Sequence, residues 1–248
     1  MTSPAVSAAG AARGVPRGRR VADGRFYSGM ALAIALTVFA GFARTYYLRP
    51  YFQDAPLVPL LHLHGIIFTA WVLLFAAQTT LVAARRTALH RRLGMASVVL
   101  VPLMLAVGAT TAVVRAKQGF APPGGPPPRV FLVIPIMDLV VFGSLAGAGF
   151  YLRRRPEAHK RLMLLATIAL LAAPIARLTP GIMRAGPPAF FGLADLFLVA
   201  CVGYDLISRR RVERPTLWGG GLILASQPLR LWLGGTAGWL AFATWLTR

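Results

Sequence analysis

Acidic residues are scarce in this chain, which has seven Asp and Glu against 27 Lys and Arg among 248 residues. In a soluble protein a net charge of +20 would indicate a nucleic-acid partner. Charged residues make up only 14% of the sequence, however, whereas hydrophobic residues make up 56%. This composition lies outside the usual range of soluble domains and is typical of membrane proteins. We therefore predict that the positive charge meets anionic lipid head groups at the bilayer surface, and we predict no nucleic-acid partner.

Cysteine and lysine are almost absent. The single cysteine, Cys201, excludes an internal disulfide framework and a cluster of cysteine metal ligands. Neither Lys117 nor Lys160 is central in an apolar run, which argues against a retinal Schiff base of the seven-helix photoreceptor type. A phosphate-binding glycine loop, a Gly-x-Ser-x-Gly elbow and a His-Glu-x-x-His motif are also missing from the sequence. These familiar enzyme chemistries therefore have no signature here.

Long apolar runs fill most of the chain, and a helix that crosses a bilayer needs roughly 20 such residues. We predict an all-α integral membrane bundle of about seven transmembrane helices over residues 27–248, after a disordered basic cytoplasmic tail over 1–26. The predicted spans cover residues 28–48, 60–84, 88–114, 130–152, 157–178, 189–208 and 216 to 233. Residues 234–247 are expected to form a short outer helix with Trp239 and Trp245 at the interface; the sequence leaves open whether this segment is an eighth crossing.

Basic residues gather in the N-terminal tail and in every second predicted loop. They are Arg13, Arg17, Arg19, Arg20 and Arg25, then Arg85, Arg86, Arg91 and Arg92, then Arg153, Arg154, Arg155, Lys160 and Arg161, and finally Arg209, Arg210, Arg211 and Arg214. Cytoplasmic loops of membrane proteins carry such an excess of Lys and Arg. We predict a multi-pass protein of a bacterial cytoplasmic (inner) membrane, with its N-terminus in the cytoplasm and its C-terminus outside.

Two of the basic loops resemble each other. The stretch from Arg85 to Leu93 and the stretch from Arg154 to Leu162 both place a histidine shortly after a pair of arginines, at His90 and His159. Each stretch separates two long apolar runs. We predict a duplicated helical hairpin whose cytoplasmic ends carry a matched pair of histidines.

The same stretches carry a family resemblance. The segments Leu-His90-Arg-Arg-Leu-Gly94 and Ala-His159-Lys-Arg-Leu-Met163 resemble uncharacterised multi-pass membrane protein families of bacteria. Those families have a Leu-His-Arg-x-Leu-Gly signature at one helix start and an Ala-His-x-x-x-Met signature at a later one. The resemblance covers roughly residues 60–180, and Leu162 stands where the families have tryptophan. It implies a shared topology rather than a particular chemistry.

The paired histidines allow two interpretations. Neutral imidazoles on two helices can hold a b-type haem or a transition metal from opposite sides, and nearby arginines can pair with haem propionates. Alternatively, His90 and His159 lie in the interfacial basic belt, where each caps its helix or contacts phosphate.

A second set of polar side chains is expected in or near the outer halves of the spans. Its members are Arg44, His62, His64, Asp138, Arg177, Asp195, Gln227 and Arg230. Because an ionised group in a membrane helix needs a partner, Asp138 should pair with Arg177, Arg44 or Arg230. The set is either a buried network that fixes helix register or an outward pocket, in which His62 or His64 joins Asp138 and Asp195 on a metal or in proton transfer. Positions two apart on a helix point about 200° apart, so His62 and His64 are not expected to bind one ion together.

Three functions follow as hypotheses. The first is a haem- or metal-binding membrane protein in electron transfer or redox-enzyme assembly, based on His90 and His159. The second is a non-redox transporter or binding protein for a small anionic or lipidic ligand, based on the outer arginines. The third is a metal-dependent membrane hydrolase that uses His62 or His64 with Asp138 and Asp195. Oligomeric state and protein partners have no signature in the sequence.

Overall fold

The computed structural model describes residues 17–53, 56–122 and 125–248, and every regular element within these ranges is helical. Six helical segments are long and apolar enough to cross a membrane by length and composition. They are α1 (Arg17–Phe42) continued by the π-helix η1 (Ala43–Tyr47), α2 (Pro59–Ala83), α3 (Thr87–Lys117), α4 (Pro128–Phe131) with α5 (Val133–Tyr151), α6 (Pro156–Ile168) with α7 (Ala172–Ala176), and α9 (Pro187–Arg209). The chain is therefore a helical, polytopic membrane protein.

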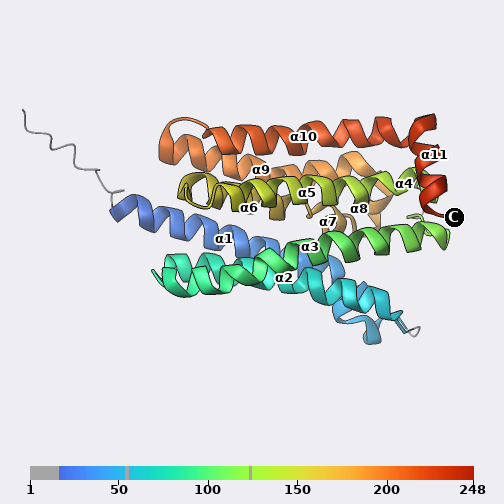
Figure 1. The fold of residues 1–248 in the computed structure, drawn as a ribbon, viewed down its shortest axis with the longest axis horizontal. Helices are drawn as coiled ribbons and strands as arrows, with labels where there is room; N and C mark the ends of the chain where they lie inside the picture. The colour runs from blue at the N-terminus through green and yellow to red at the C-terminus, as the bar shows by residue number, and fades with distance from the viewer. Residues whose placement is uncertain (1–16, 54–55, 123–124) are drawn as a thin grey trace, which may run out of the picture.

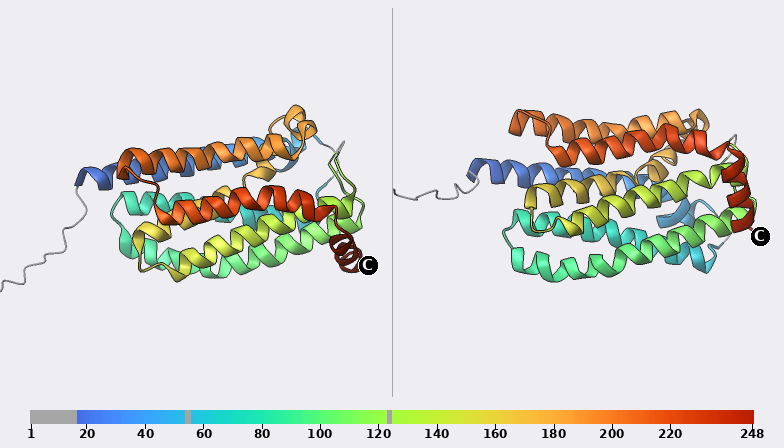
Figure 2. Two further views of the ribbon diagram at one scale, coloured as in Figure 1. Left: turned by 90° about the horizontal axis from the view of Figure 1, so that it is seen from above. Right: turned by 45° about the horizontal axis from the view of Figure 1, so that its top comes forward.

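The remaining helices are shorter or less apolar. They are the 3-10 turn η2 (Arg49–Tyr51), α8 (Pro180–Ala185), α10 (Arg214–Gly234) and α11 (Ala237–Leu246). The long helices run side by side along one axis, and α11 lies across one end of the bundle (Figures 1 and 2). The segment formed by α6 and α7 is the most buried candidate span, and it packs against α1, α5, α9 and α10.

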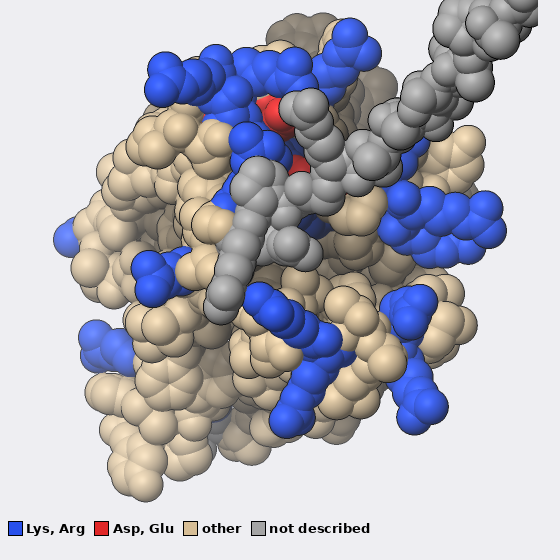
Figure 3. Space-filling view, turned by 90° about the vertical axis from the view of Figure 1, so that its left-hand side faces the viewer, with Lys and Arg blue, Asp and Glu red and all other residues tan. Residues whose placement is uncertain are grey.

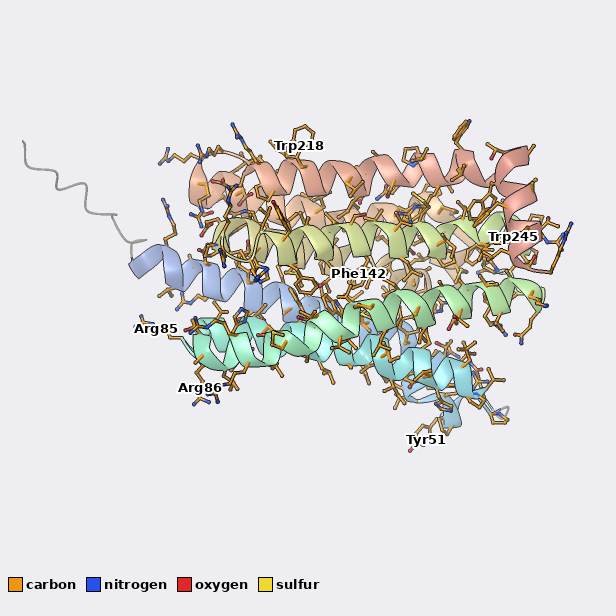
Figure 4. All side chains as sticks on the ribbon, in the orientation of Figure 1. Tyr51, Arg85, Arg86, Phe142, Trp218 and Trp245 are labelled. Atoms are coloured by element: carbon orange, nitrogen blue, oxygen red, sulfur yellow. The ribbon has the colours of Figure 1, made fainter. Side chains whose placement is uncertain are left out.

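The outward faces of the bundle are apolar. Leu36, Leu73, Val99 and Val199 each expose more than half of their surface. Soluble proteins rarely expose apolar surface on this scale, whereas lipid tails accept it. The interior holds a close-packed aromatic contact, in which the Trp71 and Phe142 rings meet edge to face with centroids 5.0 Å apart. Figure 4 shows Phe142 in the middle of the bundle.

Two spans are interrupted, and a proline explains each interruption. Proline has no N–H to donate, and its ring clashes with the carbonyl four residues earlier. Pro174 therefore disfavours a helix at Leu170, where α6 and α7 are separated, and Pro135 does the same at Phe131, where α4 ends. Gly41 adds a close crossing, since a Cβ at this position would approach the Pro174 carbonyl oxygen to 2.2 Å.

The predicted disordered tail over 1–26 is wrong in part. Helix α1 already begins at Arg17, while residues 1–16 lie outside the described residues. Contacts to distant helices hold this first part of α1 in place. Asp23 accepts a hydrogen bond from Lys160 at 2.8 Å, and the Phe26 ring stacks on Tyr204 at 3.9 Å.

The last part of the chain follows the predicted division into two helices. α10 ends at Gly234, and α11 carries Trp239 and Trp245. Trp245 is exposed, as expected at an interface, but Trp239 is buried because its Nε1 donates to the Arg129 carbonyl at 2.8 Å. α10 is not among the six helices that satisfy length and apolarity, since it carries three consecutive glycines and the polar pair Gln227 and Arg230.

The basic segments lie at one end of the bundle. The start of α1 and the α2–α3, α5–α6 and α9–α10 turns all reach this end, which we call the basic end (Figure 1). Arg85 and Arg86 point away from the helices there (Figure 4). The space-filling view of this end shows groups of Lys and Arg with few acidic atoms between them (Figure 3). The opposite end, with η1, α4, α8 and α11, is called the far end.

Candidate functional site

His90 and His159 occupy the same position in their two helices. Each lies in the first turn after a basic loop at the basic end, His90 in α3 and His159 in α6. Each backbone N–H donates at 3.0 Å to the carbonyl of the residue before its helix, which is Arg86 for His90 and Arg155 for His159. The two side chains therefore project from equivalent points at the same level of the bundle.

The two imidazole rings lie next to each other in an edge-to-face arrangement. Their centroids are 6.4 Å apart, and their planes are inclined at 77°. His159 Nδ1 lies 2.9 Å from the carbonyl oxygen of Gly149, on α5. A carbonyl oxygen only accepts, so the proton of a neutral His159 ring is on Nδ1 and the Nε2 lone pair is free. This is the outer-shell arrangement that orients histidine ligands in metal sites.

His90 has a buried nitrogen without a partner. Among the described residues, its Nδ1 has no hydrogen bond, and neither has the buried Oε1 of Gln78. Gln78, on α2, lies next to the His90 ring and next to Gly94, one turn further along α3. Two buried polar atoms without partners beside an imidazole pair are unusual, because such atoms are nearly always satisfied.

The spacing of the rings suits ligation of one metal atom. Two collinear metal–nitrogen bonds of about 2.0–2.1 Å would separate the centroids of two imidazole rings by about 6.3 Å. The observed 6.4 Å is close to this value. His90 and His159 would hold either a haem iron or a bare transition-metal ion at this spacing.

A charge-balanced network lies beside the histidine pair at the basic end. It joins α1, α6, α9 and the start of α10 and contains three acids and three bases. Its ionic members are Asp23, Glu157, Lys160, Arg161, Asp205 and Arg209. Lys160 and Arg209 each bridge Asp23 and Glu157. Because opposite charges are paired, the network adds no net charge to this end.

We call these six residues the basic-end network. Asp205 is the most buried acid among them. Arg161 donates to it through Nη2 at 2.6 Å and through Nε at 3.1 Å. Thr216 Oγ1 donates at 2.6 Å and the Glu213 backbone N–H at 3.1 Å. Arg161 and Asp205 expose only 3% and 2% of their side chains, so this pair ties α6 to α9 and α10 inside the protein.

Sequence reasoning missed this network. It assigned Lys160, Arg161 and Arg209 to lipid-facing basic loops. The available signal was the scarcity of acids, because four of the seven in the sequence lie at the basic end. They are Asp23, Glu157, Asp205 and Glu213.

A second polar group lies in the half of the bundle nearer the far end. Arg230 forms an ion pair with Asp138, so it is the partner among the three arginines considered. Its guanidinium also donates to Ser226 Oγ at 2.8 Å and lies over the Phe191 ring at 4.9 Å. Next to it, Gln227 Nε2 donates to Asp195 Oδ1 at 2.7 Å. The groups line one small cavity with Ile168, Ala169 and Ala172 from the α6–α7 segment, and we call it the mid-bundle cavity.

The predicted metal set is divided between two places. Asp138 and Asp195 line the mid-bundle cavity, whereas His64 stacks on Phe68 at 4.1 Å and His62 lies near Tyr46 at 6.0 Å. Within residues 17–53, 56–122 and 125–248, no three His, Cys, Asp or Glu side chains are grouped so that they could hold a metal ion. A hydrolase built on all four residues therefore has no support from their positions.

The predicted arginine network is divided as well. Arg230 and Gln227 lie at the mid-bundle cavity, but Arg177 and Arg44 lie elsewhere. Arg177 donates to the Ala173 carbonyl at 2.7 Å and lies over the Phe42 ring. Arg44, on η1, is exposed and lies over Phe52 at 5.0 Å.

Comparisons with known proteins add no assignment. No family model matches the chain, and no curated protein or solved structure matches it either.

Proposed function

We propose that this polytopic membrane protein holds a transition-metal centre, a b-type haem in the first instance, between His90 and His159. We further propose that it uses this centre in electron transfer or in the assembly of a redox enzyme. The observation that carries the proposal is the close approach of the two rings, whose centroids are 6.4 Å apart, with His159 oriented by the Gly149 carbonyl.

The surroundings of the pair support an occupied site. The Nδ1 atom of His90 and the Oε1 atom of Gln78 are buried and have no hydrogen-bond partner among the described residues, so a bound group could contact them. Arg91 and Arg92 follow His90 directly and are exposed, so they are available to carboxylates such as haem propionates. The chain itself would position both imidazoles and keep Nε2 of His159 unprotonated; the bound group would supply the one-electron chemistry.

The topology proposed with this function has the basic end in the bacterial cytoplasm. The accumulation of Lys and Arg there supports that orientation, since cytoplasmic loops carry such an excess. We include α10 as a seventh crossing, because its 21 residues span about 31 Å at 1.5 Å per residue and it packs along α5 and α6. The matched turns before α3 and α6 support the duplicated hairpin.

An optical spectrum tests the proposal. The full chain, expressed with ample haem supply and purified in detergent, should show a Soret band that shifts on reduction. His90→Ala and His159→Ala should each remove the band, because either change removes one of the two imidazoles that would hold the group. His62→Ala, which changes an exposed histidine at the far end, is the matched control and should keep the spectrum of the unmodified protein.

Elemental analysis of the same samples separates the two forms of the site. About one iron per chain with a Soret band supports haem, whereas one copper, zinc or iron without the band supports a bare ion. A preparation with neither metal nor haem, or one whose metal content is unchanged in both histidine variants, would reject the histidine pair as a metal site.

One observation favours a second candidate, a site for a small anionic or lipidic ligand. Among the described residues, Arg177 pairs with no carboxylate, although it lies next to the membrane-embedded α7. A phosphate or carboxylate group could neutralise it. In this case Arg177→Ala should abolish thermal stabilisation by a short-chain anionic phospholipid, while His90→Ala should leave that stabilisation intact.

A further inference from the structure

The mid-bundle cavity lies deep in the bundle. Asp138 is ten residues from the start of its span at Pro128, and Asp195 is eight residues from the start of α9 at Pro187. At 1.5 Å per residue these offsets correspond to about 15 Å and about 12 Å. The hydrocarbon core is about 30 Å thick, so both carboxylates lie near its middle. Ionisable groups at such depth are costly and mark ion or proton sites by default.

The wall of the cavity includes the turn between α6 and α7. Ile168 ends α6, Ala169 follows it, and Ala172 begins α7. Leu170 and Leu171 donate to carbonyls three residues earlier, while Ala169 and Leu171 keep α-helical dihedral angles, so this turn is tightened and not unwound. A tightened turn within a long helix often marks a functional hinge, and here it lies beside the acids of the cavity.

The charges around the cavity do not balance. Asp138 and Asp195 carry two negative charges when ionised, and Arg230 supplies one positive charge. The residues that line the cavity come from α5, α9, α10 and the α6–α7 segment, and these three side chains are the charged ones among them. Arg177, which follows α7, and Arg184, in α8, do not line the cavity. One added positive charge would make the cavity neutral, whereas an anion would raise the imbalance.

The two acids are held differently. Asp138 is in an ion pair with Arg230, whose guanidinium is fixed by Ser226 and the Ser226 carbonyl. Asp195 has only the neutral amide of Gln227 on Oδ1. Asp138 therefore has a cationic partner, whereas the partner of Asp195 in the described structure is neutral.

We propose that the mid-bundle cavity is a proton-binding site in which Asp195 takes up and releases one proton near the middle of the membrane. The proton adds to Oδ2, while Oδ1 keeps its hydrogen bond from Gln227. The cavity has room for about one water molecule, which suits a proton delivered through water and is too small for an organic cation. The site is separate from the histidine pair at the basic end and does not depend on a metal there.

Infrared difference spectroscopy of the full chain in lipid vesicles tests this directly. On acidification from neutral buffer, the unmodified protein should gain a carboxylic-acid C=O band. Asp195→Asn should lose at least about half of that band, since one of the two acids that line the cavity is removed. Glu213→Gln, which changes a side chain paired only with the exposed Arg211, is the matched control and should keep the band.

A proton-flux assay adds a functional reading on the same vesicles. With a pH-sensitive dye inside, an imposed membrane potential should drive proton entry that falls about tenfold or more in Asp195→Asn and is partly restored in Asp195→Glu. Equal melting temperatures of the three proteins would show that the fold is intact.

Two results would overturn the proposal. The first is a C=O band of the same size in Asp195→Asn as in the unmodified protein. The second is a sodium-dependent rise in melting temperature that requires Asp195 while no C=O band appears, because this would assign the cavity to a metal cation instead.

Discussion

At the scale of single residues, the few acids of this chain each have a defined partner. Six of the seven lie in the described ranges, and each accepts a hydrogen bond from a cation or an amide. They are Asp23, Asp138, Glu157, Asp195, Asp205 and Glu213. In a membrane protein an unpaired buried charge costs several kcal/mol, so the buried Arg161 and Arg230 each need an acid at a particular place.

The pair formed by Arg161 and Asp205 should be the most sensitive of these contacts. Asp205→Leu leaves the Arg161 guanidinium buried with only Glu157, and it also leaves Thr216 and the Glu213 N–H without their acceptor. Loss of one partner of a buried pair costs about 3–5 kcal/mol. We expect the melting temperature in detergent to fall by about 6 °C or more.

The double variant Arg161→Met with Asp205→Leu is the control. Replacing both charges by apolar groups removes the unpaired charge, so its melting temperature should lie above that of Asp205→Leu alone. If the single and double variants have the same melting temperature, the pair does not act as a unit. The stability that the basic-end network contributes would then come from its more exposed members.

At the scale of elements, the crossing of α1 and α7 depends on a missing side chain. A Cβ on Gly41 would meet backbone atoms of Pro174, which cannot move aside like a flexible side chain. Gly41→Ala should therefore lower the stability by about 1–3 kcal/mol through overpacking. Gly29→Ala on the same helix is the matched control, since nothing lies within 4 Å of its added methyl group. It should be neutral or raise stability by up to about 1 kcal/mol, and a thermal melt of both variants checks the difference.

The sequence was sufficient to predict those helices whose ends are determined by neighbouring residues. Apolar runs bounded by proline and basic residues placed α2, α3 and α9 within a few residues, and Gly234-Gly235 marked the break before α11. Pro174 contained the signal for the interruption of the fifth span, but it was taken only as a residue near the end of that span. The early start of α1 could not be predicted in this way, because Asp23 is held by side chains of α6 and α9 that are remote in sequence.

The candidate sites were predictable to the extent that they rely on matched or isolated residues. The histidine pair followed from two similar turns, and Asp138 was expected to need an arginine because it is an acid in an apolar run. The separation of His62 and His64 from the acids could not be predicted, since it depends on α2 lying away from α9 and α10. The division of the arginines also depends on packing between helices that are remote in sequence, as Arg177 follows the end of α7 and Arg230 lies on α10.

At the scale of the whole molecule, polar chemistry occurs at two levels. The histidine pair and the basic-end network lie at the end where the basic turns gather (Figure 1). The mid-bundle cavity lies nearer the middle of the helices, since Asp138 and Asp195 are ten and eight residues from the starts of their spans. The two levels share the α6–α7 segment, which carries His159 and Arg161 at one end and lines the cavity at the other. A single span therefore contributes residues to both levels.

This arrangement makes a topological prediction. If the bundle crosses the membrane as proposed, the α2–α3 and α5–α6 turns must face the same compartment. Cysteines introduced singly at Arg85 and Arg154, in a Cys201→Ser background, should react with a membrane-impermeant maleimide only after the cells are opened. A cysteine at Gln118, exposed after the end of α3, should react in intact cells. Labelling of Arg85→Cys and Arg154→Cys from opposite sides would separate the two histidines by the thickness of the membrane. Since the ring separation of 6.4 Å depends on their lying at one end, that outcome would reject the bundle and the metal site together.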